Sequence, residues 1–442
     1  MNVLMILEDA LRPSHLGCYG YTKNTSPNID RLAQEGVMCT QAIATGSHTI
    51  PGVFSLFTGL DSASHSIVNA KRFAAWKYEN LWKNRRTPLH EVKENGYLLD
   101  GEIVMRYEHF GFTRDTDGNK MEDYFETHRN DNWFFIAEPY PTHLPYNPPD
   151  EYYKLFLGSN PPADRETAER LKTVRSKLIV SPTHLTSKLE AGEKDPLPDS
   201  STDAAHKRTF GKVDLLPEDK PYIHALYDGE LHVFDDMVGR WVAKLDLLGI
   251  LDKTLIVLVS DHGEELMERG HVGHASCNLC GTLYDESIKI PIIMRLPSII
   301  PAGSIVRTQV SQIDLMPTIF DILGVTSSLT MDGTSMLPLI QHAASDSRVK
   351  DLSWRAECFS ETTPAGWQAL EADDREMWSV RTEKYKLIAH GREHSPDMKY
   401  EFYDLVADPY EKKNIFMQNN DACRLLQKTL TSFINRAKRI RK

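Results

Sequence analysis

Residues 254–263 read T-L-I-V-L-V-S-D-H-G, and this stretch decides the fold. Its first six residues are apolar or β-branched, which predicts a short strand that is buried on both faces. Asp261 and His262 follow at the carboxyl end of that strand. The chain begins in the same way, because a buried strand is predicted over Val3–Leu7 and ends close to Asp9. Two predicted strands therefore lead directly into acidic or imidazole side chains.

Strand and helix patterns alternate along most of the chain. Further strands are predicted over Phe134–Ala137 and Lys289–Met294, and helices are predicted from Ser26-Pro27 to Gly36, from Pro51 to Gly59, over Tyr227–Leu248 and over Asp314–Leu323. This alternation is typical of an α/β protein whose mostly parallel sheet is covered by helices on both faces.

The pattern changes toward the C terminus. Short strands are predicted over Ser379–Ile388 and Glu401–Leu405, and a last helix over Asp421–Arg441. We therefore expect a larger domain over residues 1–345 and a smaller C-terminal subdomain over residues 346–442. Within the larger domain, residues 150–220 are polar and rich in Pro, Ser and Thr, which predicts an excursion of helix and loop outside the core.

The composition narrows the class of protein. The 442 residues include 51 Lys and Arg against 62 Asp and Glu, and the net charge of −11 argues against a protein that binds the nucleic-acid backbone. No apolar run approaches the ~20 residues that span a bilayer, so no membrane partner is expected. The N terminus enters an apolar run at once, with no basic segment and no cleavage site, which predicts a cytoplasmic protein or one whose leader has been removed.

The cysteines give a weak signal. Six in 442 residues are too sparse to predict a disulfide framework. Cys277 and Cys280 form one C-x-x-C beside His271 and His274, so a zinc site or a redox pair is an alternative. Structural zinc usually requires two such pairs, and packing within a loop is therefore the preferred interpretation.

The polar strand ends predict a metal site. In an open parallel sheet, ligands bind beyond the carboxyl ends of the strands, so Asp9, Asp261 and His262 are expected to converge. Two carboxylates and an imidazole at one edge suit a divalent cation, which offsets the repulsion between the negative charges. Taken singly, each of these residues is also a common helix cap or turn former.

Thr49 is the candidate nucleophile. It stands just ahead of the helix predicted from Pro51, where unpaired N–H groups and the positive end of the dipole favour a bound oxyanion. Contact with a metal ion lowers the pKa of a hydroxyl, which would make Thr49 a nucleophile. The alternative is that Thr49 only caps the helix.

Five segments resemble the sulfatase branch of the alkaline-phosphatase superfamily, in the family's order. They are V-L-M-I-L-E-D-A-L-R-P-S-H-L-G-C-Y-G (3–20), T-I-P-G-V-F-S-L-F-T-G (49–59), F-F-I-A-E-P-Y-P-T-H-L-P-Y-N-P-P (134–149), V-S-D-H-G-E-E-L-M-E-R-G-H-V-G-H (259–274) and S-V-R-T-E-K-Y-K-L-I (379–388) with Y-D-L-V-A-D-P (403–409). The resemblance implies an alkaline-phosphatase-like three-layer αβα sandwich with a mostly parallel central sheet. It also implies a smaller C-terminal α+β subdomain with a short antiparallel sheet.

The resemblance also implies roles for individual residues. Asp9, Thr49, Asp261 and His262 would bind one divalent metal ion. His143 and His274 would hold the non-bridging oxygens of the substrate or protonate the leaving group. The candidates for substrate binding are Asn69, Lys71 and Arg114. For Arg12 and Lys71, a structural ion pair is the preferred alternative.

Departures from the family pattern bear on the chemistry. True sulfatases have Cys or Ser, converted to formylglycine, where this chain has Thr49, and an Arg where it has Val53. Threonine cannot be oxidised in that way, so the site resembles the phosphodiesterases and phosphonate monoester hydrolases of the superfamily. Ala10 replaces the usual second carboxylate, which together with His262 favours manganese or zinc over calcium. A second metal ion at Asp228 and His232 is an alternative.

The expected function is metal-dependent hydrolysis of a phosphodiester or phosphonate monoester through Thr49. The alternatives are hydrolysis of a sulfate ester, transfer of a phospho group to an alcohol, and a non-catalytic binding protein on the same scaffold. The expected partner is a small anionic ester, and a homo-oligomer is compatible with the sequence.

Overall fold

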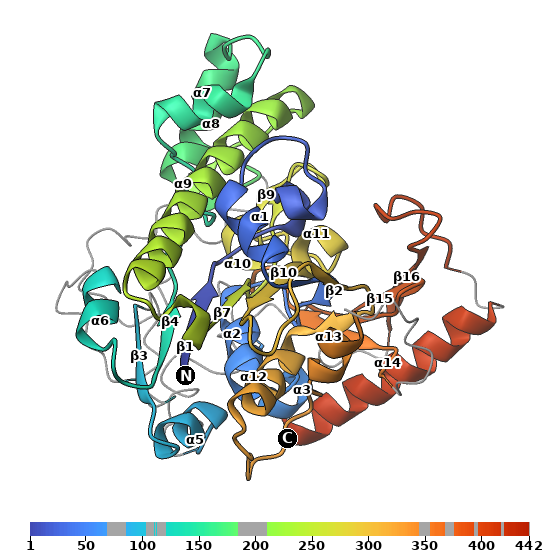
Figure 1. Ribbon diagram of the computed structural model, residues 1–442. Coiled ribbons are helices and arrows are strands. Elements are labelled where there is room, and N and C mark those ends of the chain that lie inside the picture. Colours follow the sequence, from blue (N-terminus) through green and yellow to red (C-terminus); the bar gives the residue numbers. More distant parts are fainter. Residues whose placement is uncertain are drawn as a thin grey trace.

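The computed structural model describes residues 1–68, 85–102, 110, 112, 121–183, 210–343, 354–366, 375–392, 397–416 and 420–441 (Figure 1). At its centre is an eight-stranded sheet in the order β11-β2-β10-β7-β1-β4-β3, with β12 paired to β2. These strands are β1 (Asn2–Leu7), β2 (Val37–Ile43), β3 (Leu98–Glu102), β4 (Trp133–Ala137), β7 (Thr254–Val259), β10 (Lys289–Arg295), β11 (Ser304–Val306) and β12 (Val310–Ser311). The predicted strands β1 and β7 are neighbours at the middle of the sheet.

The sheet is mostly parallel, as predicted. Strand β1 runs parallel to β4 and to β7, and the Leu7–Val259 pair stands at the carboxyl end of the β1–β7 ladder. The β3–β4, β11–β2 and β12–β2 pairs are also parallel. Strand β10 is the exception, because it is antiparallel to both β2 and β7.

Helices cover both faces of the sheet and complete three layers. Along β1, Val3, Met5 and Leu7 point into one core, whereas Leu4 and Ile6 point into the other, as the two-residue period of a strand requires. The first core is closed by α2 (Thr49–Thr58) and α12 (Leu315–Leu323), and the second by α1 (Pro27–Gln34) and α9 (Lys220–Leu247). The predicted three-layer sandwich is therefore confirmed.

The excursion after Asp150 consists of helices that pack beside α9. Helices α7 (Asp150–Leu157) and α8 (Arg165–Ser176) lie together at one end of the molecule (Figure 1). A two-stranded parallel sheet of β5 (Ile179–Ser181) and β6 (Phe210–Lys212) flanks them. Helix α9 is longer than predicted, because Pro221 in its first turn starts it seven residues before Tyr227.

The C-terminal part forms a separate antiparallel sheet. Its strands are β13 (Cys358–Thr362), β14 (Arg375–Arg381), β15 (Tyr385–Arg392) and β16 (Lys399–Asp404), and α14 (Asp421–Ile440) packs on it. The single strand predicted over Ser379–Ile388 is wrong, because this stretch turns between β14 and β15. Thr382 makes the turn, since its N–H donates to the Tyr385 carbonyl and its hydroxyl accepts from the Tyr385 N–H. The predicted boundary at residue 345 lies outside the described residues.

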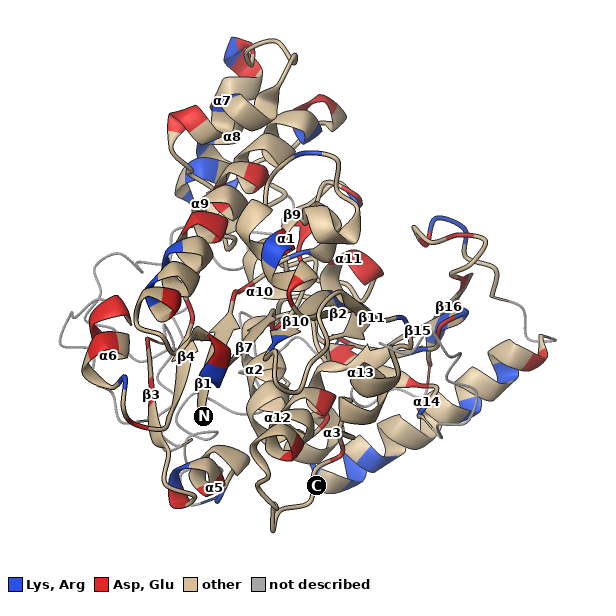
Figure 2. Cartoon of the chain, viewed as in Figure 1, with Lys and Arg blue, Asp and Glu red and all other residues tan. Residues whose placement is uncertain are grey.

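The remaining elements are short. They are α3 (Ser62–His65), α5 (Pro88–Glu94), α6 (Met121–Thr127), β8 (Glu265–Leu266), β9 (Val272–Gly273), α10 (Ala275–Asn278), α11 (Asp285–Ile288) and α13 (Leu337–Ala343). Within the described ranges, no helix combines the length and the apolar character needed to cross a bilayer. Figure 2 shows that basic residues gather along the C-terminal half of α14.

Candidate active site

Four of the predicted residues meet at the carboxyl ends of β1 and β7. The Thr49 hydroxyl donates a hydrogen bond of 3.1 Å to Asp9 Oδ2 and lies 3.4 Å from His262 Nε2. His262 Nε2 is also 3.3 Å from Asp9 Oδ1 and 3.4 Å from Asp261 Oδ2. Asp9, Asp261 and His262 are buried, whereas Thr49 is only half-buried. The side chains therefore form one cluster that remains open at the threonine.

His262 is held with one particular nitrogen toward the carboxylates. Its Nδ1–H donates to the Gly263 carbonyl at 2.7 Å, so Nε2 faces Asp9 and Asp261. Burial alone would lower the pKa of His262, but the nearby Asp261 and Asp9 raise it to about 10. Burial and the charge of Asp9 in turn raise the pKa of Asp261 to about 7. The pKa of each of these groups therefore depends on the charges of its neighbours.

The cluster fits a divalent cation. Among the described residues, Asp9 Oδ1 and Asp261 Oδ2 are buried oxygens without a hydrogen-bond partner. Such atoms cost free energy unless a positive charge satisfies them. Ligand atoms of Asp9, His262 and His274 lie within 4.8 Å of one another, and Asp261 and Thr49 adjoin them.

Helix α2 brings Thr49 to the cluster. Thr49 is the first residue of the helix rather than the residue ahead of it, and His48 takes the N-cap position. Gly52 allows the helix to approach β7, because a Cβ atom at this position would lie 2.5 Å from the Asp261 carbonyl oxygen. The N–H groups of the first turn therefore lie at the metal ligands, where they favour a bound anion.

His143 and His274 lie beside this cluster, as predicted. The Nδ1–H of His143 donates to the Leu144 carbonyl at 2.5 Å, and the ring stacks on Tyr140 with centroids 4.3 Å apart. The His274 ring is 4.9 Å from the His143 ring and 4.3 Å from the His262 ring, centroid to centroid. Two imidazoles therefore lie beside the cluster that contains Thr49.

Glu264 fixes the orientation of His274. His274 Nδ1 is 2.9 Å from Glu264 Oε2, and both side chains are fully buried. Burial raises the pKa of Glu264 well above its usual value and lowers that of His274 well below. The contact with Glu264 at Nδ1 orients the ring, and His274 Nε2 lies 3.4 Å from the Cys277 sulfur.

Glu8 ties the loop that carries His143 to the end of β1. Its carboxylate accepts hydrogen bonds from the Thr142 N–H at 2.7 Å, the Thr142 hydroxyl at 2.9 Å and the Tyr140 N–H at 3.2 Å. No role was predicted for Glu8 or Glu264, although both adjoin residues of the metal motifs. Glu8 directly precedes Asp9 and Glu264 directly follows Gly263, and these positions could have indicated a role at the site.

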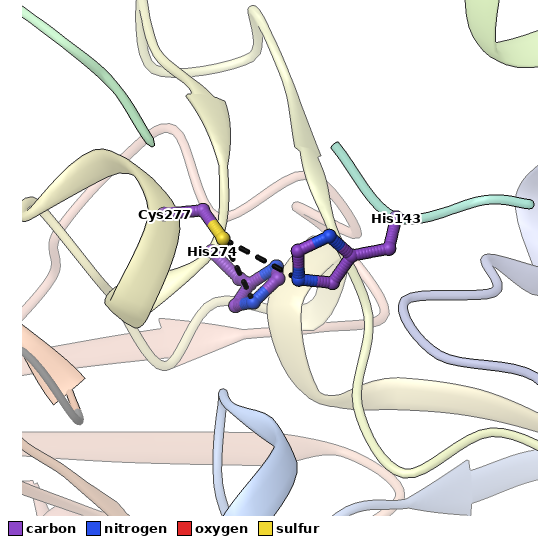
Figure 3. Close-up of side chains that lie close together, drawn as sticks. All are labelled: His143, His274 and Cys277. Atoms are coloured by element: carbon purple, nitrogen blue, oxygen red, sulfur yellow. Dashed lines mark hydrogen bonds between the residues drawn. The ribbon is translucent and has the colours of Figure 1, made fainter. Parts of the chain in front are cut away.

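Cys277 also lies at the site, although packing within a loop was the preferred prediction for it. Its Sγ lies 3.4 Å from Nε2 of His143 and 3.4 Å from Nε2 of His274 (Figure 3). Cys277 and Cys280 form no disulfide, so the alternative of a redox pair does not hold in this structure. The H-x-x-C spacing could have indicated that His274 and Cys277 lie together. It gave no indication of His143, which comes from a loop far away in the sequence.

The other predicted residues are placed differently. Asn69, Lys71 and Arg114 lie outside the described residues. Arg12 forms a structural ion pair with Glu268 at 2.7 Å. The Asp228 carboxylate is paired with His15 at 2.7 Å and with Lys23 at 2.8 Å, whereas His232 is directed at the Thr25 carbonyl. The structure therefore does not join Asp228 and His232 in one metal site.

Comparison with known families and structures agrees with this fold. Residues 1–325 match the sulfatase family, and residues 281–439 match the C-terminal region of N-sulphoglucosamine sulphohydrolase. The chain is 26% identical to the multifunctional alkaline phosphatase superfamily protein PehA of Trinickia caryophylli, over 94% of this chain and 91% of that protein.

Two further similar proteins are named for the hydrolysis of different esters. The chain is 22% identical to an N-acetylglucosamine-6-O-sulfatase of Bacteroides thetaiotaomicron, over 94% of this chain and 82% of that protein. Its fold is similar to that of the phosphonate monoester hydrolase of Agrobacterium radiobacter, with a TM-score of 0.71 and 19% identity over 99% of this chain and 96% of that chain.

Proposed function

The chain belongs to the sulfatase family and is a hydrolase of sulfate or phosphate esters, and we propose that its substrates are phosphodiesters or phosphonate monoesters. The observation that carries this proposal is the Thr49 hydroxyl, which is 3.1 Å from Asp9 Oδ2 at the first turn of α2. An unmodified threonine cannot use the formylglycine chemistry of sulfatases, whereas an alkoxide can attack phosphorus directly.

Asp9, Thr49, Asp261 and His262 would hold the divalent cation. When bound, the cation supplies positive charge that favours the ionised hydroxyl and offsets charge on the transferring group. We propose manganese or zinc rather than calcium, because His262 offers nitrogen and Ala10 offers no carboxylate.

The reaction proceeds in two halves. In the first, the Thr49 hydroxyl gives its proton to solvent, its oxygen bonds to phosphorus, and the bond to the leaving oxygen breaks. The leaving oxygen takes a proton from His143 or His274. In the second, water attacks the phosphothreonine and gives a proton back to that imidazole, and Thr49 recovers a proton from solvent as its bond to phosphorus breaks. Amide N–H groups at the start of α2 hold the anionic oxygens in both halves.

Removal of the hydroxyl tests the proposal. Thr49→Val keeps the shape of the side chain, and we expect at least a ~1,000-fold lower kcat/KM for bis-p-nitrophenyl phosphate and for a p-nitrophenyl phosphonate monoester. Thr49→Ser keeps the hydroxyl and serves as the matched control, with most of the activity retained. Rapid quenching of the wild-type protein should also reveal a phosphorylated peptide that contains Thr49. Full turnover by Thr49→Val would place the nucleophile elsewhere.

Hydrolysis of sulfate esters is the second candidate, because the chain is similar to an N-acetylglucosamine-6-O-sulfatase along most of its length. The ratio of kcat/KM for p-nitrophenyl sulfate to that for the phosphodiester decides between the two. A ratio above one favours the sulfatase. The phosphodiester assay with an added alcohol reports on transfer, since a new diester of that alcohol in place of the phosphate monoester would identify a transferase.

A further inference from the structure

We propose that His143, His274 and Cys277 bind a second metal ion, Zn²⁺, next to the cation held by Asp9, Thr49, Asp261 and His262. The inference rests on the proposed function, because it assigns the leaving-group side of the same pocket. It differs from the second metal site considered from the sequence, since Asp228 is already occupied by His15 and Lys23.

The distances are those of ligands around zinc. With Zn–N of about 2.05 Å, Zn–S of about 2.3 Å and a tetrahedral angle, a nitrogen and a sulfur ligand stand about 3.5 Å apart. Cys277 Sγ lies 3.4 Å from His143 Nε2 and 3.4 Å from His274 Nε2, and all three ligand atoms lie within 4.8 Å of one another. Figure 3 shows the sulfur and the two ring nitrogens directed at one another.

The second nitrogen of each imidazole is engaged in the way that metal-binding histidines require. His143 Nδ1 donates to the Leu144 carbonyl, and His274 Nδ1 is bonded to the Glu264 carboxylate. A carbonyl or carboxylate on Nδ1 orients the ring and leaves Nε2 as the ligand atom. Both rings therefore present Nε2 to Cys277.

The ligand types also suit zinc. A zinc ion would engage the Cys277 thiolate and both Nε2 atoms at once. Soft thiolate with imidazole is the ligand set that zinc prefers.

The ligands are held on firm supports. His274 is the N-cap residue of α10 and Cys277 is the third residue of that helix, so one turn positions both. His143 is buried against Tyr140, and its loop is fixed to β1 by Glu8. Three protein ligands leave one zinc position for the substrate, which is the pattern of catalytic rather than structural zinc.

The second ion would add positive charge on the side of the leaving group. The His274 ring is 4.3 Å from the His262 ring, centroid to centroid, so the two ions would share one pocket. Paired ions stabilise the attacking oxygen and the leaving oxygen of a displacement at the same time. With that ion bound, His143 and His274 would be ligands, so the leaving oxygen would take its proton from water and not from an imidazole.

Cobalt substitution tests the proposal without reliance on turnover. The metal-free chain is titrated with Co²⁺, and we expect a thiolate-to-cobalt charge-transfer band in the near ultraviolet, with about two ions bound per chain. Cys277→Ser should abolish the band and leave about one ion bound. Cys280→Ser is the matched control on the same loop, because its thiol is not directed at either imidazole, and it should keep the band. A wild-type protein without the band, or a Cys277→Ser protein with it, overturns the proposal.

Two further measurements keep the test decisive. X-ray absorption of the wild-type zinc protein should show one sulfur at about 2.3 Å from zinc, and this needs no variant to fold. Its absence would also overturn the proposal. Thr49→Val, measured in the same preparations, separates the two proposals. Loss of turnover without a thiolate band supports only the threonine nucleophile, whereas a thiolate band with turnover retained supports only the second zinc site.

Discussion

At the scale of single residues, Glu264 sets the orientation of the His274 ring. The carboxylate is fully buried and 2.9 Å from Nδ1 of the ring, and it makes no direct contact with Thr49 among the hydrogen bonds of the described residues. It is a positioning residue, because its effect on the pocket passes through the imidazole. Partners of this kind raise the basicity of a ligand and hold its ring in place.

Replacement of Glu264 should therefore weaken metal binding before it affects folding. We expect Glu264→Gln to lower the affinity for the second zinc ion by about 10- to 100-fold, measured by competition with a chelating dye. Glu265→Gln is the control on the adjacent residue. Glu265 accepts a hydrogen bond from the Thr282 hydroxyl at 2.7 Å, whereas Glu264 contacts the His274 ring, so Glu265→Gln should leave the zinc affinity unchanged. Equal zinc affinities of the two variants would contradict the assignment.

The ion pair of Arg12 and Glu268 predicts sensitivity to acid. Burial alone would raise the pKa of Glu268, but the Arg12 guanidinium at 2.7 Å lowers it to about 2. A lowered pKa stabilises the folded state above the unfolded-state value of about 4.3, and this contribution is lost as the pH falls toward about 2. Glu268→Gln should cost about 3 kcal/mol at pH 7 and much less at pH 3, measured by urea unfolding. Glu169→Gln, on the surface of α8, should change stability by less than about 0.5 kcal/mol at either pH.

At the scale of elements, the approach of α2 to β7 sets the position of the nucleophile. Gly52 lies against the backbone of Asp261, so the helix and the strand end touch with no side chain between them. The Gln312 amide nitrogen also donates to the Gly52 carbonyl at 3.1 Å and to the Asp261 carbonyl at 3.2 Å. The distance between Thr49 and the metal ligands is thus fixed by main-chain contact.

A methyl group at Gly52 should separate activity from stability. Gly52→Ala pushes the start of α2 away from Asp261, and a displacement of about 1 Å costs about 100-fold in turnover. Gly239→Ala is the matched control, because its new methyl group would lie 2.7 Å from the Asn28 side chain, on the far helix α9. We expect both variants to lose melting temperature and only Gly52→Ala to lose kcat. A similar kcat loss in Gly239→Ala would show that general destabilisation explains the effect.

Some of these elements could be predicted from the sequence, and others could not. Strands β1 and β7 were predicted because a buried parallel strand is a continuous apolar run. Their shared sheet edge then placed Asp9 beside Asp261 and His262. The β14–β15 turn was missed because Thr382 makes it with its side chain, without Gly or Pro. The contact between His143 and Cys277 could not be predicted, because it depends on the paths of two loops and not on any spacing.

At the scale of the whole molecule, a buried ion network joins the C-terminal sheet to the larger domain. Asp285, on α11, accepts two hydrogen bonds from Arg381 at 2.9 and 2.8 Å and one from Lys386 at 3.0 Å. Lys386 also pairs with Glu411 at 2.8 Å, and both side chains are buried. Met377, Ile388 and Tyr403 of the C-terminal sheet contribute to the same hydrophobic core as the central sheet. The two units therefore share their interior.

Loss of the central carboxylate should destabilise both units together. Asp285→Asn leaves Arg381 and Lys386 buried with an incomplete partner, and we expect a cost of about 3–5 kcal/mol in a single unfolding transition. Asp252→Asn is the control, since that residue pairs with Arg295 while 75% of its side chain is exposed, and it should cost less than about 1 kcal/mol. Two separate transitions in Asp285→Asn would show that the units unfold independently.

The pairing of β1 with β7 has a consequence for how a newly made chain acquires its metal. Asp9 emerges from the ribosome early, yet its partners Asp261 and His262 follow about 250 residues later. Of the four ligands of the first cation, a half-synthesised chain therefore contains only the oxygens of Asp9 and Thr49. Selection of the correct ion is postponed until translation is well past the middle of the message, when the folded sheet rather than the nascent peptide decides which metal is kept.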